Sequence, residues 1–318
     1  MDTAVHDTLN VTLLEPRQKH PTIFERFDAL ANGNTLEILN DHDPKPLYYQ
    51  MLGERGNIFN WKYVEEGPQW WRVHITKRLT EGETIGQIAA KDLRKAKVFK
   101  KYGLDFCCGG KKTLTEACLE KGLDVTRIEV ELEQADAIPA GRALPYLDWS
   151  LDFLAEYIVQ THHSYVKATL PQLVGYAEKV ARVHGGRHPE LLEVKKLVGE
   201  VNGEMTSHMV KEERILFPYI KSIVQQESTG VVARQEHFGT VQNPINMMEM
   251  EHEFVGSAME KLREVTNGYT LPQDACASYS LLYRILDEFE NDLHLHVHLE
   301  NNILFPKAIK LEQELNLN

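Results

Sequence analysis

Residues 208–218 read HMVKEERILFP, and residues 296–306 read HVHLENNILFP. Both stretches follow the pattern His-x3-Glu-x3-Leu-Phe-Pro. Residues four apart on an α-helix share a face, about 6 Å apart along the axis. Each stretch therefore directs an imidazole and a carboxylate toward one region of space. Two such helices that face each other would supply one pocket with His208, Glu212, His296 and Glu300.

These four residues fall on apolar stripes, which predict buried helix faces. One stripe comprises Val201, Met205, His208, Glu212, Ile215 and Tyr219, and the other comprises Ile285, Phe289, Leu293, His296, Glu300 and Ile303. His163 and His252 lie on similar stripes. A buried carboxylate is costly unless it is paired or bound to a metal. One such histidine is typical of a hydrogen-bonded core residue, but four helices that each bury a histidine favour a metal site.

The ligand types narrow the choice of metal. Four histidines and two glutamates are too many for one zinc ion, which takes four ligands. Imidazole with carboxylate favours iron, with manganese and zinc as weaker alternatives. Ferritin-like sites use Glu-x-x-His and mostly carboxylates, whereas nitrogen dominates here. Residues 149–318 thus resemble the hemerythrin-like domain. The resemblance implies an all-α four-helix bundle that holds two iron ions in an oxo-bridged di-iron centre. The implied terminal ligands are His163, His208, His252 and His296, and the implied bridging ligands are Glu212 and Glu300.

The remaining histidines of this region are interpreted differently. On one straight helix His163 and His184 would lie about 31 Å apart. Pro171 lies between them, and a proline can kink a helix but rarely folds it back. His184 is therefore left out of the predicted site. Three other histidines lie on other faces and are expected to be solvated or to support the ligands: His162, His294 and His298.

The whole chain has 318 residues, enough for two or three domains. Its net charge of −12 argues against nucleic acid and anionic membranes as partners. It has no run of roughly 18 apolar residues, so no membrane span is expected. The amino terminus lacks the basic-then-apolar form of a signal peptide. Four cysteines without framework spacing suit a reducing compartment, and the expected location is the cytoplasm.

Residues 1–78 are predicted to form a small α/β sandwich. The pattern predicts helices at 20–30 and 46–52, a strand at 35–40, and a hairpin from 57–63 and 69–75. Residues 40–44 (NDHDP) and 65–68 (EEGP) resemble a widespread small bacterial domain of unknown function. The domain also looks like the small sulfur carriers, but it lacks their Cys-Pro dipeptide. His42, with Asp41 and Asp43, is interpreted as a solvated turn, with a binding site as the alternative.

Residues 79–138 are predicted to form a short helical domain. Thr84 begins a capping-box pattern, and its helix should run to Tyr102. A second capping box starts at Thr113. Cys107 and Cys108 lie between them. Adjacent cysteines cannot easily chelate one metal, and a disulfide between them is strained and easily reduced. The nearby helix amino terminus should lower a thiol pKa, although a tight turn with two small residues is the plainer alternative.

Residues 102–110 (YGLDFCCGG) resemble the amino-terminal domain of the iron-sulfur cluster repair proteins, a family that joins this CCGG domain to a hemerythrin-like bundle. The resemblance implies repair of, or iron supply to, iron-sulfur clusters damaged by nitric oxide or oxidative stress. Cys107 and Cys108 would then serve as a catalytic redox pair or in handover of nitric oxide or iron. Residues 140–145 would link this domain to the bundle domain, residues 139–318. The small α/β domain is an addition to the family's usual two-domain pattern.

Two other functions stay open at this point. One is an enzyme that reduces nitric oxide or handles peroxide at the di-iron centre, and the other is a module that binds or senses O2 or nitric oxide. The implied partners are damaged iron-sulfur proteins or cluster assembly proteins, together with nitric oxide or O2. Neither nucleic acid nor a membrane is expected, and a homodimer is one option for the oligomeric state.

Overall fold

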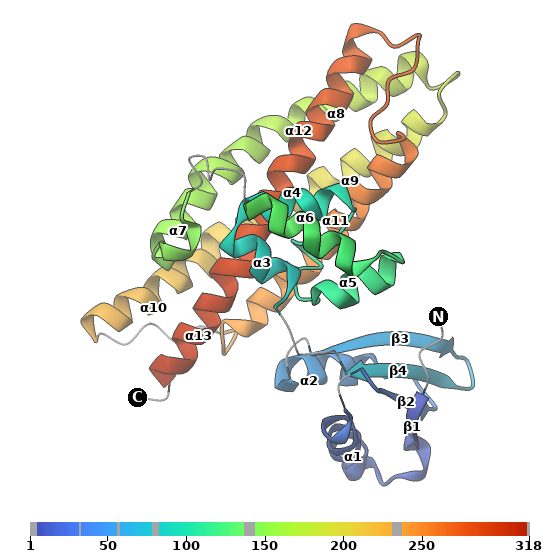
Figure 1. The fold of residues 1–318 in the computed structure, drawn as a ribbon, viewed down its shortest axis with the longest axis vertical. Coiled ribbons are helices and arrows are strands. Elements are labelled where there is room, and N and C mark those ends of the chain that lie inside the picture. Colours follow the sequence, from blue (N-terminus) through green and yellow to red (C-terminus); the bar gives the residue numbers. More distant parts are fainter. Residues whose placement is uncertain are drawn as a thin grey trace. The chain divides into compact units, whose positions relative to one another are not determined.

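The computed structural model describes residues 5–31, 33–55, 58–77, 83–136, 144–230 and 237–316. The chain forms two compact units (Figure 1), one of residues 1–85 with 111–129 and one of residues 86–110 with 130–318. The predicted domain boundaries at 78/79 and 138/139 lie outside the described residues, as do positions 140–143 of the predicted linker.

The first unit contains a four-stranded sheet with the order β1-β2-β4-β3. Strand β1 is parallel to β2, whereas β4 is antiparallel to both β2 and β3. The strands and their two helices are β1 (Val5–Asn10), α1 (Pro16–Ala29), β2 (Thr35–Asn40), α2 (Lys45–Arg55), β3 (Phe59–Glu66) and β4 (Trp71–Lys77). Buried residues of both helices, among them Phe27 and Met51, share one core with Leu36 and Val73 of the sheet. The predicted small α/β domain is confirmed, but β1 was not predicted.

The segment after the sheet corrects one predicted helix. A single helix from Thr84 to Tyr102 is wrong, because the structure has α3 (Ile85–Lys91) and α4 (Leu93–Lys101). Asp92 separates them, and its carboxylate accepts a hydrogen bond from the Arg94 amide at 2.9 Å. An aspartate at this position caps a new helix and so favours the break. The second predicted capping box is present at the start of α5 (Leu114–Lys121), and α6 (Val125–Asp136) follows.

The second unit is mostly helical. Its long helices are α8 (Ser164–His184), α9 (Glu190–Lys211), α11 (Gln242–Val265) and α12 (Ala277–Leu299). Helix α8 packs against α9 and α12, and α9 packs against α11, so that the four run alongside one another (Figure 1). Their buried stripes form one hydrophobic core. The shorter helices α7 (Leu151–Ile158), α10 (Phe217–Thr229) and α13 (Phe305–Asn316) share a second core with Met248 and Leu299.

Wide π-helical turns interrupt this unit at Val159–His163, Glu212–Leu216 and Glu300–Leu304. In the second turn the Phe217 amide donates to the Glu212 carbonyl, five residues back. Pro218 follows, and a proline lacks the amide donor and clashes with the carbonyl four residues before it. A wider turn relieves that clash. The extra residue rotates the buried face, so Ile215 is 48% exposed and Leu216 is 1% exposed. The predicted burial of Ile215 is wrong for this reason.

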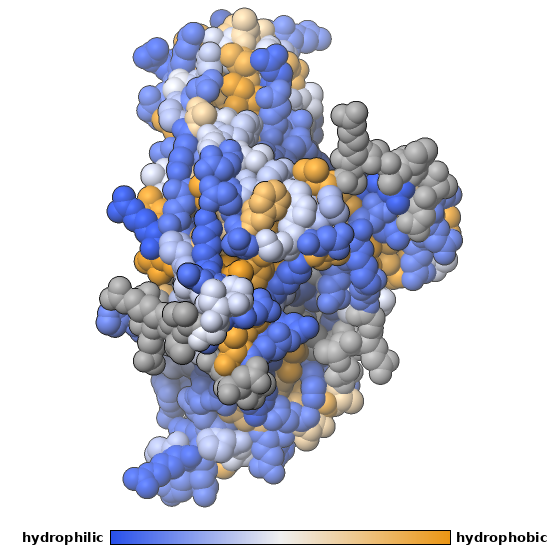
Figure 2. Space-filling view, turned by 90° about the vertical axis from the view of Figure 1, so that its left-hand side faces the viewer, coloured by the Kyte–Doolittle hydropathy of each residue, from blue (hydrophilic) through white to orange (hydrophobic). Residues whose placement is uncertain are grey.

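The surface is predominantly hydrophilic on the face that Figure 2 shows, with hydrophobic residues in small separate groups. Within the described ranges, no helix combines the length and the hydropathy needed to cross a membrane.

Candidate metal centre

The six predicted ligands lie together in two groups that share both glutamates. Within each group, one ligand atom from every residue lies within 4.8 Å of the others. The groups are His163, Glu212, His296, Glu300 and His208, Glu212, His252, Glu300. All six residues are buried. His208 Nε2 lies 3.2 Å from Glu212 Oε2, and His296 Nε2 lies 3.0 Å from Glu300 Oε1, so the spacing of four places each pair on one helix face.

The π turns position these ligands. His163 is the last residue of the first π turn, whereas Glu212 and Glu300 are the first residues of the second and third. Wide turns of this kind are frequent at functional sites. The motif Leu-Phe-Pro, which follows both glutamates, thus fixes the local backbone in addition to filling the core.

Three of the four histidines are held from outside the site. His163 Nδ1 donates to Glu213 at 2.7 Å, and His208 Nδ1 donates to Glu251 at 2.9 Å. His252 Nδ1 lies 2.9 Å from Asn301 Oδ1. An acceptor at Nδ1 fixes the hydrogen there and leaves the lone pair of Nε2 pointing inward, as metal-binding histidines require. No pattern in the sequence indicated these acceptors.

Several of the inward atoms have no well-formed hydrogen bond within the protein. Among the described residues, His163 Nε2, both carboxylate oxygens of Glu212 and Glu300 Oε2 are buried without a well-formed hydrogen bond. His208 Nε2 and His252 Nε2 lie 3.0 Å apart, although both Nδ1 hydrogens are donated outward. Two lone pairs at this distance would repel each other, so a proton in the metal-free protein, or a metal ion, must lie between them. The donor set of imidazole nitrogen and carboxylate oxygen suits iron, so these residues fit a metal centre.

The charges of the site shift its pKa values. Burial disfavours a charged His163, but Glu212 and Glu300 outweigh burial and raise the pKa of His163 to about 10. Burial is likewise outweighed at His208, mainly by Glu212, and its pKa is raised to about 10. Burial and the charge of Glu300 act to raise the pKa of Glu212, yet His208 and His163 lower it to about 2. A metal binds neutral imidazole, so its entry would release protons from these histidines.

Two of the histidines that were expected to be solvated or to support the ligands are shielded from solvent. His162 and His298 are buried. The His162 ring stacks on His296 with centroids 5.4 Å apart, and His162 Nδ1 lies 2.9 Å from Asp292 Oδ1. Asn302 donates to His298 Nδ1 at 3.1 Å, and burial lowers the pKa of His298 to about 4. His162 therefore packs behind a ligand candidate, whereas His298 packs against Phe106 with ring centroids 5.5 Å apart.

The other two histidines lie outside the ligand groups. His294 is partly exposed and packs against Phe106. His184 lies at the carboxyl end of α8, and its Nε2 is 3.2 Å from Cys276 Sγ. In the part of the chain that the structure describes, neither belongs to a group of side chains that could hold a metal.

Cys107 and Cys108 lie in a turn that Asp105 holds in place. The Asp105 carboxylate accepts from the backbone amides of Cys107, Cys108 and Gly109. Cys107 is buried in the core of the long helices. Its contact with Cys108, its burial and the nearby Asp105 raise the pKa of the Cys107 thiol well above its usual range. A pKa lowered by the following helix is therefore wrong for Cys107.

The same turn qualifies a second expectation. Adjacent cysteines were expected to chelate one metal with difficulty. Asp105, Cys107 and Cys108 nevertheless offer ligand atoms within 4.8 Å of one another. The Asp105 carboxylate also stabilises the turn, because its Oδ1 accepts hydrogen bonds from Cys107 Sγ at 3.0 Å and from backbone amides.

The exposed thiol of Cys276 is expected to alkylate faster than that of Cys107 near neutral pH. Each unit by which a thiol pKa rises lowers the reactive thiolate about tenfold, and burial also blocks the reagent. The measurement is a time course with iodoacetamide, followed by mass spectrometry of the cysteine peptides. Faster modification of Cys107 would contradict the buried placement of that residue.

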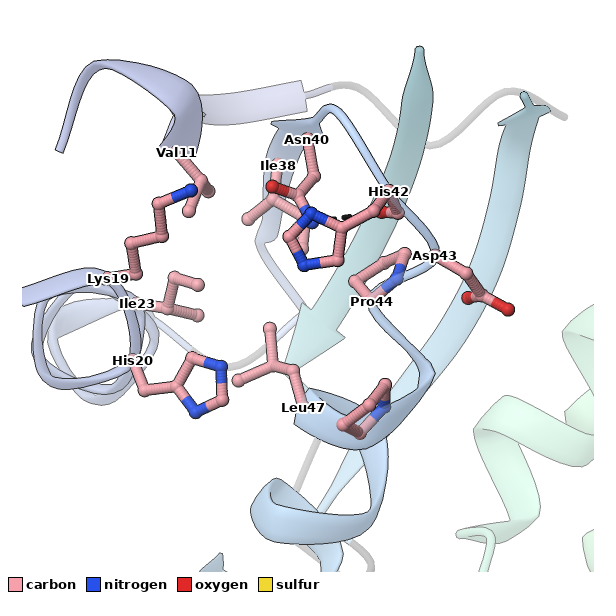
Figure 3. A pocket seen from close by; sticks show the side chains of 11 residues that line it. Val11, Lys19, His20, Ile23, Ile38, Asn40, His42, Asp43, Pro44 and Leu47 are labelled. Carbon is pink, nitrogen blue, oxygen red and sulfur yellow. Dashed lines mark hydrogen bonds between the residues drawn. The ribbon is translucent and has the colours of Figure 1, made fainter. Parts of the chain in front are cut away.

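His42 borders a small pocket of the first unit (Figure 3). The cavity of about 50 Å³ lies at the carboxyl ends of β1 and β2. His42 Nδ1 lies 2.6 Å from Asp41 Oδ1, and both side chains are mostly exposed. Asn40 donates to the His42 carbonyl at 2.9 Å, while Asp43 accepts from Tyr63. These are the contacts of a hydrogen-bonded polar turn.

Comparison with known proteins identifies the family. Residues 155–308 match the family described as "Hemerythrin HHE cation binding domain". Residues 81–136 match a "Domain of Unknown function", and residues 8–77 match an "Uncharacterized conserved protein" family. The chain is 36% identical over 230 residues to the iron-sulfur cluster repair protein YtfE of Citrobacter koseri, covering 71% of this chain and 96% of that protein. The chain belongs to the iron-sulfur cluster repair protein family.

Other members of this family show the same degree of similarity. The protein of that name from Dickeya chrysanthemi is 35% identical over 233 residues, 72% of this chain and 98% of its own length. The protein from Escherichia coli O81 is 36% identical over 230 residues, 71% of this chain and 96% of its own. The rest of this chain has no counterpart in those alignments.

Proposed function

We propose that this member of the iron-sulfur cluster repair family is a di-iron protein that restores, or supplies iron to, clusters damaged by nitric oxide or oxidative stress. One observation carries the proposal: two buried ligand groups share Glu212 and Glu300. In this assignment His163 and His296 bind one iron, His208 and His252 bind the other, and the glutamates and an oxo group bridge them. The bound irons would supply exchangeable, redox-active metal.

The surrounding side chains orient the ligand candidates and balance their charge. Glu213 and Glu251 hold two of the histidines, and each also pairs with a lysine, Lys167 and Lys211 respectively. The ligand candidates are buried among apolar side chains. In the absence of metal, protons on the histidines balance the two carboxylates. This balance favours an iron site that can be emptied without leaving two bare charges in the core.

The cysteine turn is proposed to take part in handover of nitric oxide or iron, or as a redox pair. Cys108 is partly exposed, and its Sγ lies 3.4 Å from the backbone carbonyl of His252. This places a thiol beside a ligand residue. The further proposed features are a short helical CCGG domain at residues 79–138, a four-helix bundle at 139–318, an α/β domain at 1–78, and a cytoplasmic location. The proposed partners are damaged iron-sulfur proteins or cluster assembly proteins, with nitric oxide or O2 as small molecules.

Iron-loaded protein is expected to reactivate an iron-sulfur enzyme damaged by nitric oxide, with a matching loss of its own iron. The Cys107→Ser/Cys108→Ser variant should keep its iron, because these thiols complete neither ligand group, but should reactivate the enzyme poorly. The measurements are enzyme activity and the iron content of both proteins after separation. Cys118→Ser is the matched control for the loss of a buried thiol.

Three results would count against this function. Full reactivation of the damaged enzyme by the double variant would show that the cysteine turn has no part in repair. Loss of iron from the variant would make the cysteines structural residues or metal ligands. Repeated consumption of nitric oxide under reductant, with all iron retained, would favour an enzyme instead of an iron donor.

A further inference from the structure

The cysteine turn, residues 105–110, contacts the ligand candidate His252 in two ways. Asn301 lies between them, with Oδ1 2.9 Å from His252 Nδ1 and Nδ2 3.4 Å from the Cys107 carbonyl. Cys108 Sγ lies 3.4 Å from the backbone carbonyl of His252. Asn301 is 5% exposed, so both of its hydrogen bonds are shielded from water.

The chemistry of the amide fixes the direction of these bonds. Only Nδ2 of Asn301 can donate to the Cys107 carbonyl, which turns Oδ1 toward His252. Because this oxygen can only accept, His252 Nδ1 must carry the hydrogen, and Nε2 presents its lone pair to the site. The position of the cysteine turn therefore determines which way the amide of Asn301 faces, and the amide determines the tautomer of His252.

The turn is packed closely enough for this contact to be specific. Asn302, the next residue of the same π turn, donates to the Phe106 carbonyl at 3.0 Å. A Cβ atom on Gly110 would lie 2.4 Å from the Phe106 carbonyl oxygen and 2.6 Å from Asn302 Oδ1. A Cβ atom on Gly256 would lie 3.2 Å from Cys108 Sγ. The turn thus has little room to shift without moving the asparagines.

We propose that Asn301 is a positioning residue that couples the cysteine turn to His252, so that metal occupancy and the conformation of the turn influence each other. The coupling rests on the proposed metal site, whereas the orientation of His252 by Asn301 does not. A coupling between two sites is reciprocal at equilibrium. Metal at His252 should therefore hold the cysteine turn in its position against Asn301. The turn in that position should in return favour retention of metal.

Two substitutions separate the two hydrogen bonds of Asn301. Asn301→Asp keeps an acceptor for His252 Nδ1 but loses the donor to Cys107, whereas Asn301→Leu loses both. Asn302→Asp is the matched control, because it loses the donor to Phe106 on the same turn, together with the bond to His298 Nδ1, and contacts no ligand candidate. Circular dichroism and thermal melting of every variant would establish that it is folded.

The first readout is the alkylation rate of Cys108 in metal-free and ferrous-loaded protein. In the wild type, loading should slow alkylation by roughly fivefold or more, the lower end of typical coupling factors. Asn301→Asp should keep its iron but lose this difference. Asn301→Leu should lose the difference and also release iron to a chelator about 10–100 times faster. Asn302→Asp should keep the difference.

The second readout needs no iron. In metal-free protein labelled with 15N, the imidazole shifts of His252 should show hydrogen at Nδ1 in the wild type and in Asn301→Asp, and this preference should disappear in Asn301→Leu. If the wild type binds no iron yet shows this pattern, the proposed function fails and the positioning role stands. An unchanged pattern in Asn301→Leu, or a wild-type difference in alkylation that survives in Asn301→Asp, would overturn the role of Asn301.

Discussion

Replacing Glu300 with leucine is expected to remove both irons from the protein. Glu300 belongs to both ligand groups, as does Glu212, whereas each histidine belongs to one. Glu212→Leu should therefore have the same effect, while His252→Leu should leave about one iron per chain. The measurement is the iron content of variants that are purified without oxygen and then loaded with ferrous iron. The wild-type protein, treated in the same way, is expected to hold about two irons per chain.

The chain offers controls for this experiment. Glu312 is also buried, and its carboxylate accepts hydrogen bonds from Tyr219 and the Val241 amide. Glu312→Leu removes a buried carboxylate outside the ligand groups and should keep the full iron content, as should His184→Leu. Two irons in Glu300→Leu, or one tightly bound zinc in the wild type, would contradict the shared-glutamate site.

Removal of the metal is expected to lower the melting temperature of the second unit. Without a cation, the carboxylates and imidazoles remain in an apolar core with protons as their only neutralising charges. A ligand that binds only the folded state at a hundredfold excess over its Kd stabilises by about 3 kcal/mol. For a unit of this size that free energy corresponds to roughly 5–10 °C. Calorimetry of metal-free and reloaded protein measures the difference.

A variant that cannot bind metal provides the comparison for this prediction. The Glu212→Leu/Glu300→Leu variant should melt at the same temperature with and without iron, because it lacks both shared ligands. Equal melting temperatures for the two forms of the wild type would mean that water or internal hydrogen bonds already satisfy the site.

The grouping of the ligand candidates could be predicted in part from the sequence, because their positions depend on local helix geometry. A spacing of four on an apolar stripe already places His208 with Glu212 and His296 with Glu300. The strand Thr35–Asn40 was predicted with the same bounds as β2 for a similar reason, since alternation is a local signal. The wrong burial of Ile215 arose where that local rule changes, at a π turn, and Pro218 was its one visible sign.

The residues that support the ligands depend on tertiary contacts and gave a weaker signal. Glu213 and Glu251 each adjoin a ligand candidate in sequence, yet charged residues beside a buried stripe are usually solvated. Asn301 reaches His252 only because another helix is packed against its own. The burial of Cys107 likewise follows from how its turn packs against the long helices, and no pattern within CCGG indicates it.

The π turns also make the register of the chain a part of the site. Deleting one of the residues 213–216 would remove the extra residue of the turn and leave an uninterrupted α-helix, in which Pro218 would clash with the carbonyl four residues before it. The wide turn that begins at Glu212 would then be lost, although every ligand candidate would still be present in the sequence. Helices of this kind tolerate exchanges of side chains far better than changes of length. The two copies of the motif are therefore constrained in their residue count as strictly as in their chemistry.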